Sequence, residues 1–198
     1  MKKYLVAFAA VPGAMLGATP ALAHLNPAEH ASFSTGFLHP LSGADHVLAM
    51  VGVGLWAALL GGRALWAVPT TFVIVMMAGF AAALGGMPLP FIEPAISASV
   101  VVLGLLAMMA FKVPTPIGMV VVGFFALFHG FAHGGELGNA SATSFLVGFA
   151  LATALLHAAG ILLGPGIARI AGDRAGKLAT QFAGGVTALA GLALIVGG

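Results

Sequence analysis

Four of the seven histidines in this chain fall in two short clusters that also contain acidic residues. In chain order, the members of the two clusters are His39, Asp45, His46, His129, His133 and Glu136. Both clusters lie in nearly uncharged sequence. Ionisable groups inside a membrane are costly and usually mark an ion pathway, a proton relay or a cofactor site. Because imidazole and carboxylate are also ligands that divalent transition metals accept, the clusters indicate ion handling or a bound metal.

Helical spacing places the first cluster along one face of a helix. His39 and His46 are seven residues apart, which is about two turns along one face. Asp45 points about 100° away from His46, where it could bind the same ion or hold an imidazole in orientation. Because Pro40 suits the first turn of a helix, we expect the first membrane helix to begin near His39.

The second cluster also shares a helical face. His133 follows His129 by four residues and Glu136 follows His133 by three, so all three lie within about two turns. Gly130 and Gly134 would let a neighbouring helix approach closely. This face could clamp one metal ion or pass it on stepwise.

The composition is that of an integral membrane protein. Hydrophobic residues make up 61% of the chain and charged residues 6%, and the mean hydropathy is +1.12. Soluble domains contain about 25% charged residues, so a soluble fold would lack a polar surface. The chain has no cysteine, which excludes disulfides, thiolate sites and iron–sulfur clusters. A metal site must therefore use nitrogen and oxygen ligands, with methionine sulfur as the one addition.

The first 23 residues have the pattern of a secretory signal peptide. Lys2 and Lys3 precede an apolar stretch, and a small-x-small motif ends at Ala23. Cleavage there would make His24 the N-terminal residue, and the alternative is an uncleaved membrane helix. The two lysines account for the whole formal charge of +2, so that charge does not indicate a nucleic-acid partner. We expect a signal peptide at 1–23, a periplasmic segment at 24–36 and a membrane domain at 37–198.

Six apolar runs of about 20 residues follow the signal, each long enough to cross a bilayer as a helix. They predict an all-α fold, a six-helix transmembrane bundle, with spans near Phe37–Gly61, Ala64–Gly85, Ile92–Phe111, Ile117–Gly135, Thr143–Gly164 and Ala175–Val196. All basic residues after the signal fall on the side that this arrangement makes cytoplasmic: Arg63, Lys112, Arg169, Arg174 and Lys177. We therefore expect both termini of the mature chain in the periplasm.

This topology brings the two clusters to the same depth. The first span runs inward and the fourth runs outward, so both clusters lie in the outer half of the membrane. Glu93 begins the third span on the same side, with Ser97 one turn deeper. These groups could converge on one outward-facing site, although Glu93 and Glu136 would also suit the wet interface.

The remaining histidines are separate questions. His157 lies deep in the fifth span, where it could be an inner station for the ion, a proton acceptor or a packing residue. His24 and His30 precede the membrane domain. With its α-amine, His24 could capture metal beside His30, and the alternative is a solvated tail.

Three segments resemble the HupE/UreJ family of bacterial nickel/cobalt permeases. They are residues 36–46 (GFLHPLSGADH), 93–100 (EPAISASV) and 128–136 (FHGFAHGGE), and the resemblance covers essentially the whole mature chain. It implies uptake of Ni²⁺, or of Co²⁺, across the bacterial inner membrane, in support of hydrogenase or urease maturation. It also implies that seven residues matter for transport: His39, Asp45, His46, Glu93, His129, His133 and Glu136.

Several alternatives remain open at this point. Histidines four apart beside an acid could hold zinc for an intramembrane hydrolase, and paired histidines could ligate haem in an electron carrier. Metal-dependent turnover without metal flux would favour the first, and a Soret band the second. The chain has no nucleotide-binding motif, so facilitated diffusion and proton coupling are the open driving forces, and homo-oligomerisation is open too. Because imidazole binds metal only when neutral, we expect uptake to fall below about pH 6.5.

Overall fold

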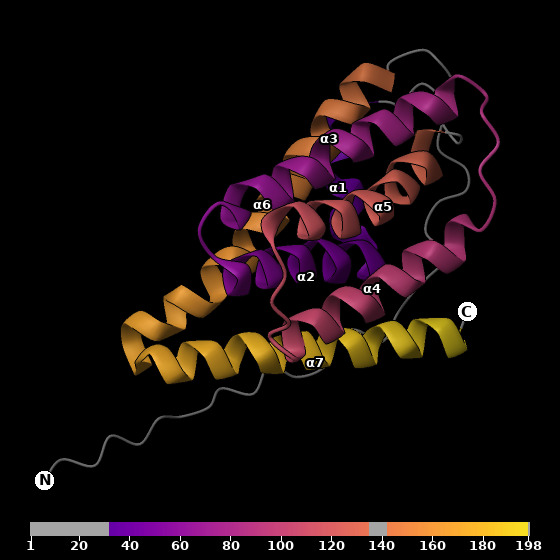
Figure 1. Cartoon of the computed structure of the whole chain (residues 1–198). Coiled ribbons are helices and arrows are strands. Elements are labelled where there is room, and N and C mark those ends of the chain that lie inside the picture. The colour runs from indigo at the N-terminus through magenta and orange to yellow at the C-terminus, as the bar shows by residue number, and fades with distance from the viewer. Residues whose placement is uncertain (1–31, 135–141, 198) are drawn as a thin grey trace, which may run out of the picture.

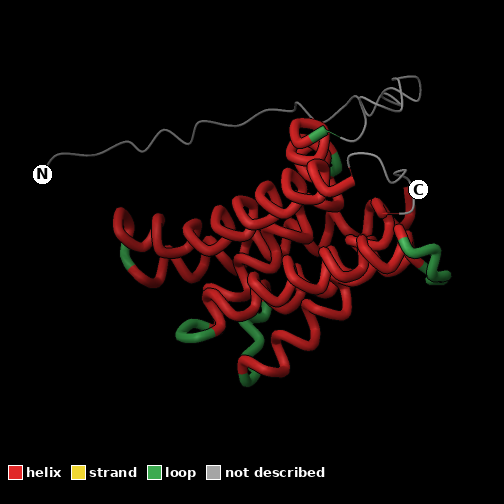
Figure 2. Tube along the Cα trace, turned by 90° about the horizontal axis from the view of Figure 1, so that it is seen from above, coloured by secondary structure: helices red, strands yellow, loops and turns green. Residues whose placement is uncertain are grey.

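The computed structural model describes residues 32–134 and 142–197. Within these residues the fold consists of seven helices without strands, which confirms the predicted all-α class. The helices are α1 (Phe33–Ser42), α2 (Ala44–Leu60), α3 (Ala64–Leu84), α4 (Ile92–Met108), α5 (Thr115–Gly134), α6 (Ala142–Ala171) and α7 (Asp173–Gly197). Figure 2 shows short connections at the ends of long helices. The predicted signal peptide lies outside the described residues.

The first predicted span is wrong as a single helix. It is divided into α1 and α2, which are bent by 83° at Gly43. Helix α1 begins at Phe33, where the Oγ of Ser32 accepts from the backbone N of Thr35 at 3.1 Å, so Pro40 lies inside the helix and not at its start. Because Pro40 lacks the N–H that its turn requires, the end of α1 is weakened. Gly43 then takes extended backbone and α2 starts in a new direction.

A second prediction is wrong at the end of α6. The Gly164-Pro165-Gly166 segment was expected to end a span, but α6 continues through it to Ala171. Pro165 removes one backbone hydrogen bond. Packing compensates, since Gly164 lies directly against Thr180 of α7 and that contact supports α6 at the proline.

Close backbone contacts assemble the helices. Helix α3 packs along α5, α4 along α7, and α6 against α1, α2 and α7 (Figure 1). A Cβ at Gly130 would overlap the carbonyl oxygen of Met76, and one at Gly134 would overlap that of Phe80. The close approach predicted for these two glycines is therefore confirmed, and it holds the part of α5 that carries His129 and His133 against α3.

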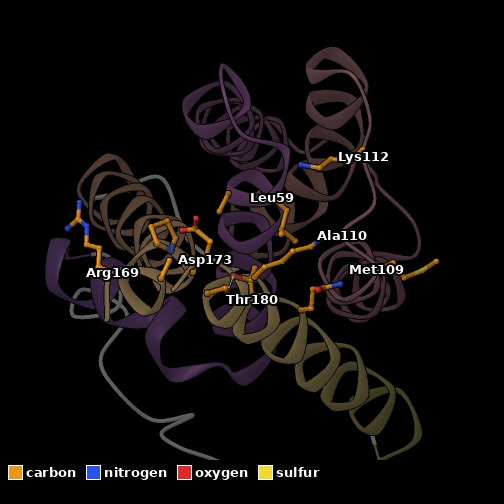
Figure 3. Close-up of a pocket in the computed structure, with 14 residues that line it drawn as sticks. Leu59, Met109, Ala110, Lys112, Arg169, Asp173 and Thr180 are labelled. Carbon is orange, nitrogen blue, oxygen red and sulfur yellow. Dashed lines mark hydrogen bonds between the residues drawn. The ribbon is translucent and has the colours of Figure 1, made fainter. Parts of the chain in front are cut away.

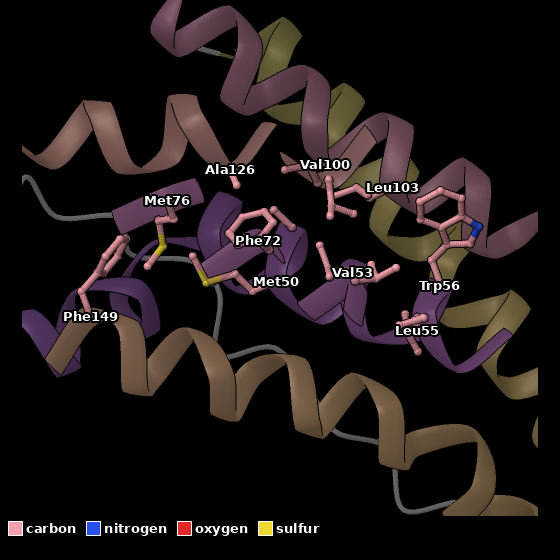
Figure 4. Packing of buried hydrophobic residues seen from close by; sticks show 14 of the residues in the cluster. Met50, Val53, Leu55, Trp56, Phe72, Met76, Val100, Leu103, Ala126 and Phe149 are labelled. Atoms are coloured by element: carbon pink, nitrogen blue, oxygen red, sulfur yellow. The ribbon is translucent and has the colours of Figure 1, made fainter. Parts of the chain in front are cut away.

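Large apolar side chains fill the core and also cover the outer surface. Trp56, Phe72 and Phe149 are fully buried (Figure 4), while many other large apolar side chains are exposed on the helices. In the part of the chain that the structure describes, four helices are long and apolar enough to cross a membrane, and α1 with α2 would make a fifth. Helix α4 is shorter, with 17 residues. The protein is a multi-pass membrane protein, and the count of six spans stays a prediction.

The bundle has two chemically different ends. At the histidine end lie the α1–α2 break, the start of α4 and the end of α5. At the opposite, basic end, the connections and adjoining turns carry every lysine and arginine of the described residues: Arg63, Lys112, Arg169, Arg174 and Lys177. A cavity of about 830 Å³ at this end is lined partly by Lys112, Arg169 and Asp173 (Figure 3). Its described lining contains no histidine, so this cavity does not belong to the site considered next.

Candidate metal centre

Three histidines from three helices meet at the histidine end. His39 lies near the end of α1, His46 in the first turn of α2 and His133 in the last turn of α5. One ring nitrogen of each lies within 4.8 Å of the others. The ring of His133 lies 4.2 Å from that of His39 and 4.8 Å from that of His46, measured between centroids. We call these three residues the histidine cluster.

The break at Gly43 produces this arrangement. The sequence predicted that His39 and His46 share one face of a helix. This prediction is wrong, because the two residues lie on different helices, one on each side of the bend. Their rings nevertheless approach edge to face at 5.8 Å. A Cβ at Gly43 would lie 2.7 Å from Oδ1 of Asp45 and 3.1 Å from Nδ1 of His46. The absence of a side chain at Gly43 therefore leaves room for the contact between Asp45 and His46.

Asp45 orients His46. Its Oδ1 lies 2.9 Å from Nδ1 of His46, and a carboxylate that accepts from one ring nitrogen fixes the proton there. The Nε2 of neutral His46 then carries a lone pair. That Nε2 lies 2.7 Å from Nε2 of His133, so His133 donates and His46 accepts. Asp45 thus prepares His46 as a nitrogen ligand.

The distance between Nε2 of His46 and Nε2 of His133 is close to the separation of two nitrogen ligands on one metal ion. Imidazole nitrogens bind divalent transition metals at about 2.0–2.1 Å, and two such ligands at right angles lie about 3.0 Å apart. An ion that entered between the two nitrogens would need the rings to separate by a few tenths of an ångström. For Nε2 of His133 to bind the ion, its proton would have to move to Nδ1 of the same ring, because a neutral imidazole binds metal through the nitrogen that carries the lone pair.

Two phenylalanines of α6 form a wall beside the cluster. The ring of Phe149 lies 5.2 Å from that of His133 and 6.0 Å from that of His39, and the ring of Phe145 lies 5.7 Å from that of His39. His46 and His133 are buried, while His39 is partly exposed. The wall excludes water from one side, which strengthens electrostatic interactions within the cluster.

His129 lies next to the cluster but is held by a different helix. Its ring is 5.1 Å from that of His46, and its Nε2 lies 3.0 Å from the hydroxyl of Ser99 on α4. Ser99 donates its own proton to the carbonyl of Ile96 at 2.6 Å. His129 must therefore donate from Nε2 and keep the lone pair on Nδ1. Within the described part of the chain, this fully buried Nδ1 has no hydrogen-bond partner.

Glu93 does not join the cluster directly. It is exposed at the start of α4 and lines a cavity of about 570 Å³ together with Asp45 and Ser97. Asp45 borders this cavity and also contacts His46, so its carboxylate connects the two places. The cavity therefore has two carboxylates in its lining, and one of them contacts the histidine cluster.

The structure places the other predicted site residues as follows. Glu136, His24 and His30 lie outside the described residues. His157 is fully buried in α6, away from the cluster, as the sequence analysis expected.

Ser99 and the two α6 phenylalanines are site residues that the sequence did not predict. Ser99 lies in the segment 93–100, but Ser97 was singled out because it is one turn from Glu93. The spacing of Phe145 and Phe149 is that of any buried helix, so only the packing of α6 against α1 identifies them as site residues.

Comparison with known proteins identifies the family of the chain. The family model described as HupE / UreJ protein matches residues 13–194, which include all of the residues of the site. The chain belongs to the HupE/UreJ family. Protein HupE of Rhizobium leguminosarum bv. viciae is 48% identical over 182 residues, covering 91% of this chain and 93% of the relative. No solved structure matches the chain.

Family membership decides between the functional classes left open by the sequence. Members of the HupE/UreJ family are nickel/cobalt permeases and not enzymes. The family therefore supports metal uptake and does not favour the hydrolase or the haem carrier.

Proposed function

We propose that this HupE/UreJ protein takes up Ni²⁺, with Co²⁺ as the second candidate, by secondary transport across the bacterial inner membrane. The observation that carries the proposal is the meeting of His39, His46 and His133 from three helices around one point. Imidazole suits nickel and cobalt, and three nitrogens held by separate helices can change their spacing when the helices move. The ion is the substrate of the protein, and no permanent cofactor is proposed.

In this proposal the ion meets carboxylates first. Glu93 and Asp45 line one cavity at the histidine end and attract a hydrated cation, and Glu136 is proposed to act with them. The cluster then replaces water with imidazole, and the lone pair of His129 receives the ion next. Such a site must bind strongly enough to remove water and weakly enough to release the ion. Capture of metal by His24 and His30 remains a prediction for the N-terminal segment.

The charge distribution supports the orientation of the protein in this proposal. Every lysine and arginine of the described residues lies at the basic end, away from the histidine cluster. Basic residues collect on the cytoplasmic side of membrane proteins. The histidine end therefore faces the periplasm, both termini of the mature chain lie there, and the ion travels toward the cytoplasm. There it supplies hydrogenase or urease maturation.

Metal uptake by cells tests the proposal. Cells without their own nickel uptake system express wild type, His46→Ala, His133→Ala or, as a control at the basic end, Lys177→Ala. We expect near-complete loss of ⁶³Ni²⁺ accumulation in both histidine variants at normal membrane levels, and wild-type accumulation in the control. Accumulation that is unchanged in both histidine variants would rule out transport through this site.

A further inference from the structure

His157 is a buried histidine whose polarity the fold does not satisfy. It is 1% exposed, and neither ring nitrogen has a hydrogen-bond partner within the described part of the chain. A neutral imidazole carries one donor and one acceptor, and each polar group buried without a partner costs about 1–3 kcal/mol. Most buried polar side chains in native proteins are hydrogen-bonded. A histidine kept only for packing would therefore cost stability that an apolar ring would not.

Rings connect His157 to the cluster in steps of similar length. Centroid separations are 4.8 Å from His133 to His46, 5.1 Å from His46 to His129, 5.6 Å from His129 to Phe72 and 5.0 Å from Phe72 to His157. Phe72 is the one ring in this series that has no ligand atom, and Figure 4 shows it in the middle of the core. His157 therefore lies one side chain beyond His129, on the far side of Phe72.

The backbone around His157 is tightly held. A Cβ at Gly54 of α2 would overlap the carbonyl oxygen of His157, and one at Gly160 would overlap that of Val51. Helices α2 and α6 are thus in backbone contact at this point, and the backbone of His157 cannot shift unless the two helices separate. Gly54 belongs to the second half of α2, so His157 lies nearer the basic end than His46 does.

The surroundings of His157 suit weak and temporary binding. Thr153, one turn earlier on α6, has a hydroxyl that donates to the sulfur of Met76 at 3.7 Å, and both residues are buried. His157 also borders a cavity of about 270 Å³ between α3 and α6, where Thr70 is the one other polar residue among the described lining residues. This volume is enough for several water molecules. One imidazole with such neighbours binds an ion less strongly than three imidazoles do.

We propose that His157 is a second binding station for the transported divalent cation, reached from His129 past the ring of Phe72. The inference rests on the proposed transport function and adds a place where the ion stops after it leaves the histidine cluster. The ring nitrogen of His157 that carries the lone pair serves as the ligand atom. The absence of competing hydrogen bonds lets this nitrogen accept the ion and release it toward the basic end.

The test separates binding at the cluster from movement through the protein. His157→Phe keeps a ring against Phe72 and removes both nitrogens, and His157→Asn keeps a small polar group as a second variant. Uptake of ⁶³Ni²⁺ is measured in cells, and Ni²⁺ affinity is measured by calorimetry on the purified full-length proteins. Retained affinity shows at the same time that a variant is folded.

We expect His157→Phe to bind Ni²⁺ with wild-type affinity and to transport it at least tenfold more slowly, whereas His46→Ala loses both properties. Wild-type uptake in both His157 variants, with uptake lost in His46→Ala, would overturn the second station and leave the proposed function intact. Loss of binding affinity in both His157 variants would also overturn it, because His157 would then support the cluster structurally. Normal uptake in His46→Ala would defeat the proposed function itself.

Discussion

His46 and His157 are both buried histidines, but their surroundings differ in every polar respect. His46 has Asp45 on one ring nitrogen and His133 on the other. His157 has an aromatic ring beside it and no hydrogen bond to either nitrogen in the described residues. A histidine whose proton position is fixed by a carboxylate is prepared to bind metal. A histidine without such support binds weakly, which is what an ion in transit requires.

The two ends of the bundle extend this contrast. The histidine end combines imidazoles with Asp45 and Glu93, which attract a divalent cation. The cavity at the basic end is lined by Lys112, Arg169 and Lys177 with the carboxylate of Asp173, so its net positive charge does not favour a divalent cation. Binding strength therefore decreases along the proposed path, from three imidazoles, through His157, to a surface that repels the ion.

The largest expected difference between the two regions comes from His39→Ala. Removing one of three proposed ligands should lower the Ni²⁺ affinity of the purified protein by more than the roughly 10–100-fold that loss of a supporting residue costs. His157→Phe should leave the same affinity unchanged. Calorimetric titration of both variants makes the comparison, and equal affinities in the two would remove the distinction between cluster and station.

Asp45→Asn should produce the next largest effect. The neutral amide no longer stabilises the proton on Nδ1 of His46, so we expect Ni²⁺ affinity to fall by roughly 10–100-fold. Asp173→Asn removes the same charge at the basic end and is the matched control, with an expected change below about twofold. The same titration checks both, and a comparable loss in the control would point to a general effect of charge.

Ser99→Ala should affect passage more than binding. It removes the acceptor for Nε2 of His129, and loss of one hydrogen bond of about 1 kcal/mol corresponds to about a fivefold effect. We expect the initial uptake rate to fall by that factor while the affinity of the cluster stays within about twofold. Thr71→Val is the control, because Thr71 bonds only to the backbone of its own helix. A fall in affinity equal to the fall in rate would place His129 in the cluster itself.

Gly43→Ala should have the smallest effect. The new Cβ would lie 2.7 Å from Oδ1 of Asp45, but Asp45 is partly exposed, so its carboxylate can shift slightly and still accept from Nδ1 of His46. The strain that this shift would put on the Asp45 side chain corresponds to about a threefold loss of Ni²⁺ affinity. Gly123→Ala is the control, since its Cβ would meet its nearest neighbour at 3.6 Å. If Gly43→Ala lost as much Ni²⁺ affinity as Asp45→Asn, the bend itself would be essential to the site.

Sequence reasoning was successful where a long apolar run decides the structure. Helices α3, α4, α5 and α7 lie where hydropathy predicted them, to within a few residues. The convergence of the two histidine clusters was also predictable, because alternating spans bring the start of one and the end of another to the same side. The contact between His46 and His133 agrees with this expectation for one residue of each cluster.

The features that sequence reasoning missed depend on tertiary contacts. The bend at Gly43 lies inside an apolar run, so hydropathy gives no sign of it, and Pro40 was interpreted as a helix start. The contact of the Asp45 carboxylate with His46 also depends on that bend. Ser99 supports His129 only because α4 packs against α5. In each case the missing information was which helix faces which.

X-ray absorption at the nickel edge of the purified, Ni²⁺-loaded protein tests the central claim most directly. The claim predicts three imidazole ligands with metal–nitrogen distances of about 2.1 Å, falling to two in His39→Ala and remaining three in His157→Phe. A first shell of oxygen alone, or an imidazole count that is unchanged in His39→Ala, His46→Ala and His133→Ala, would contradict it.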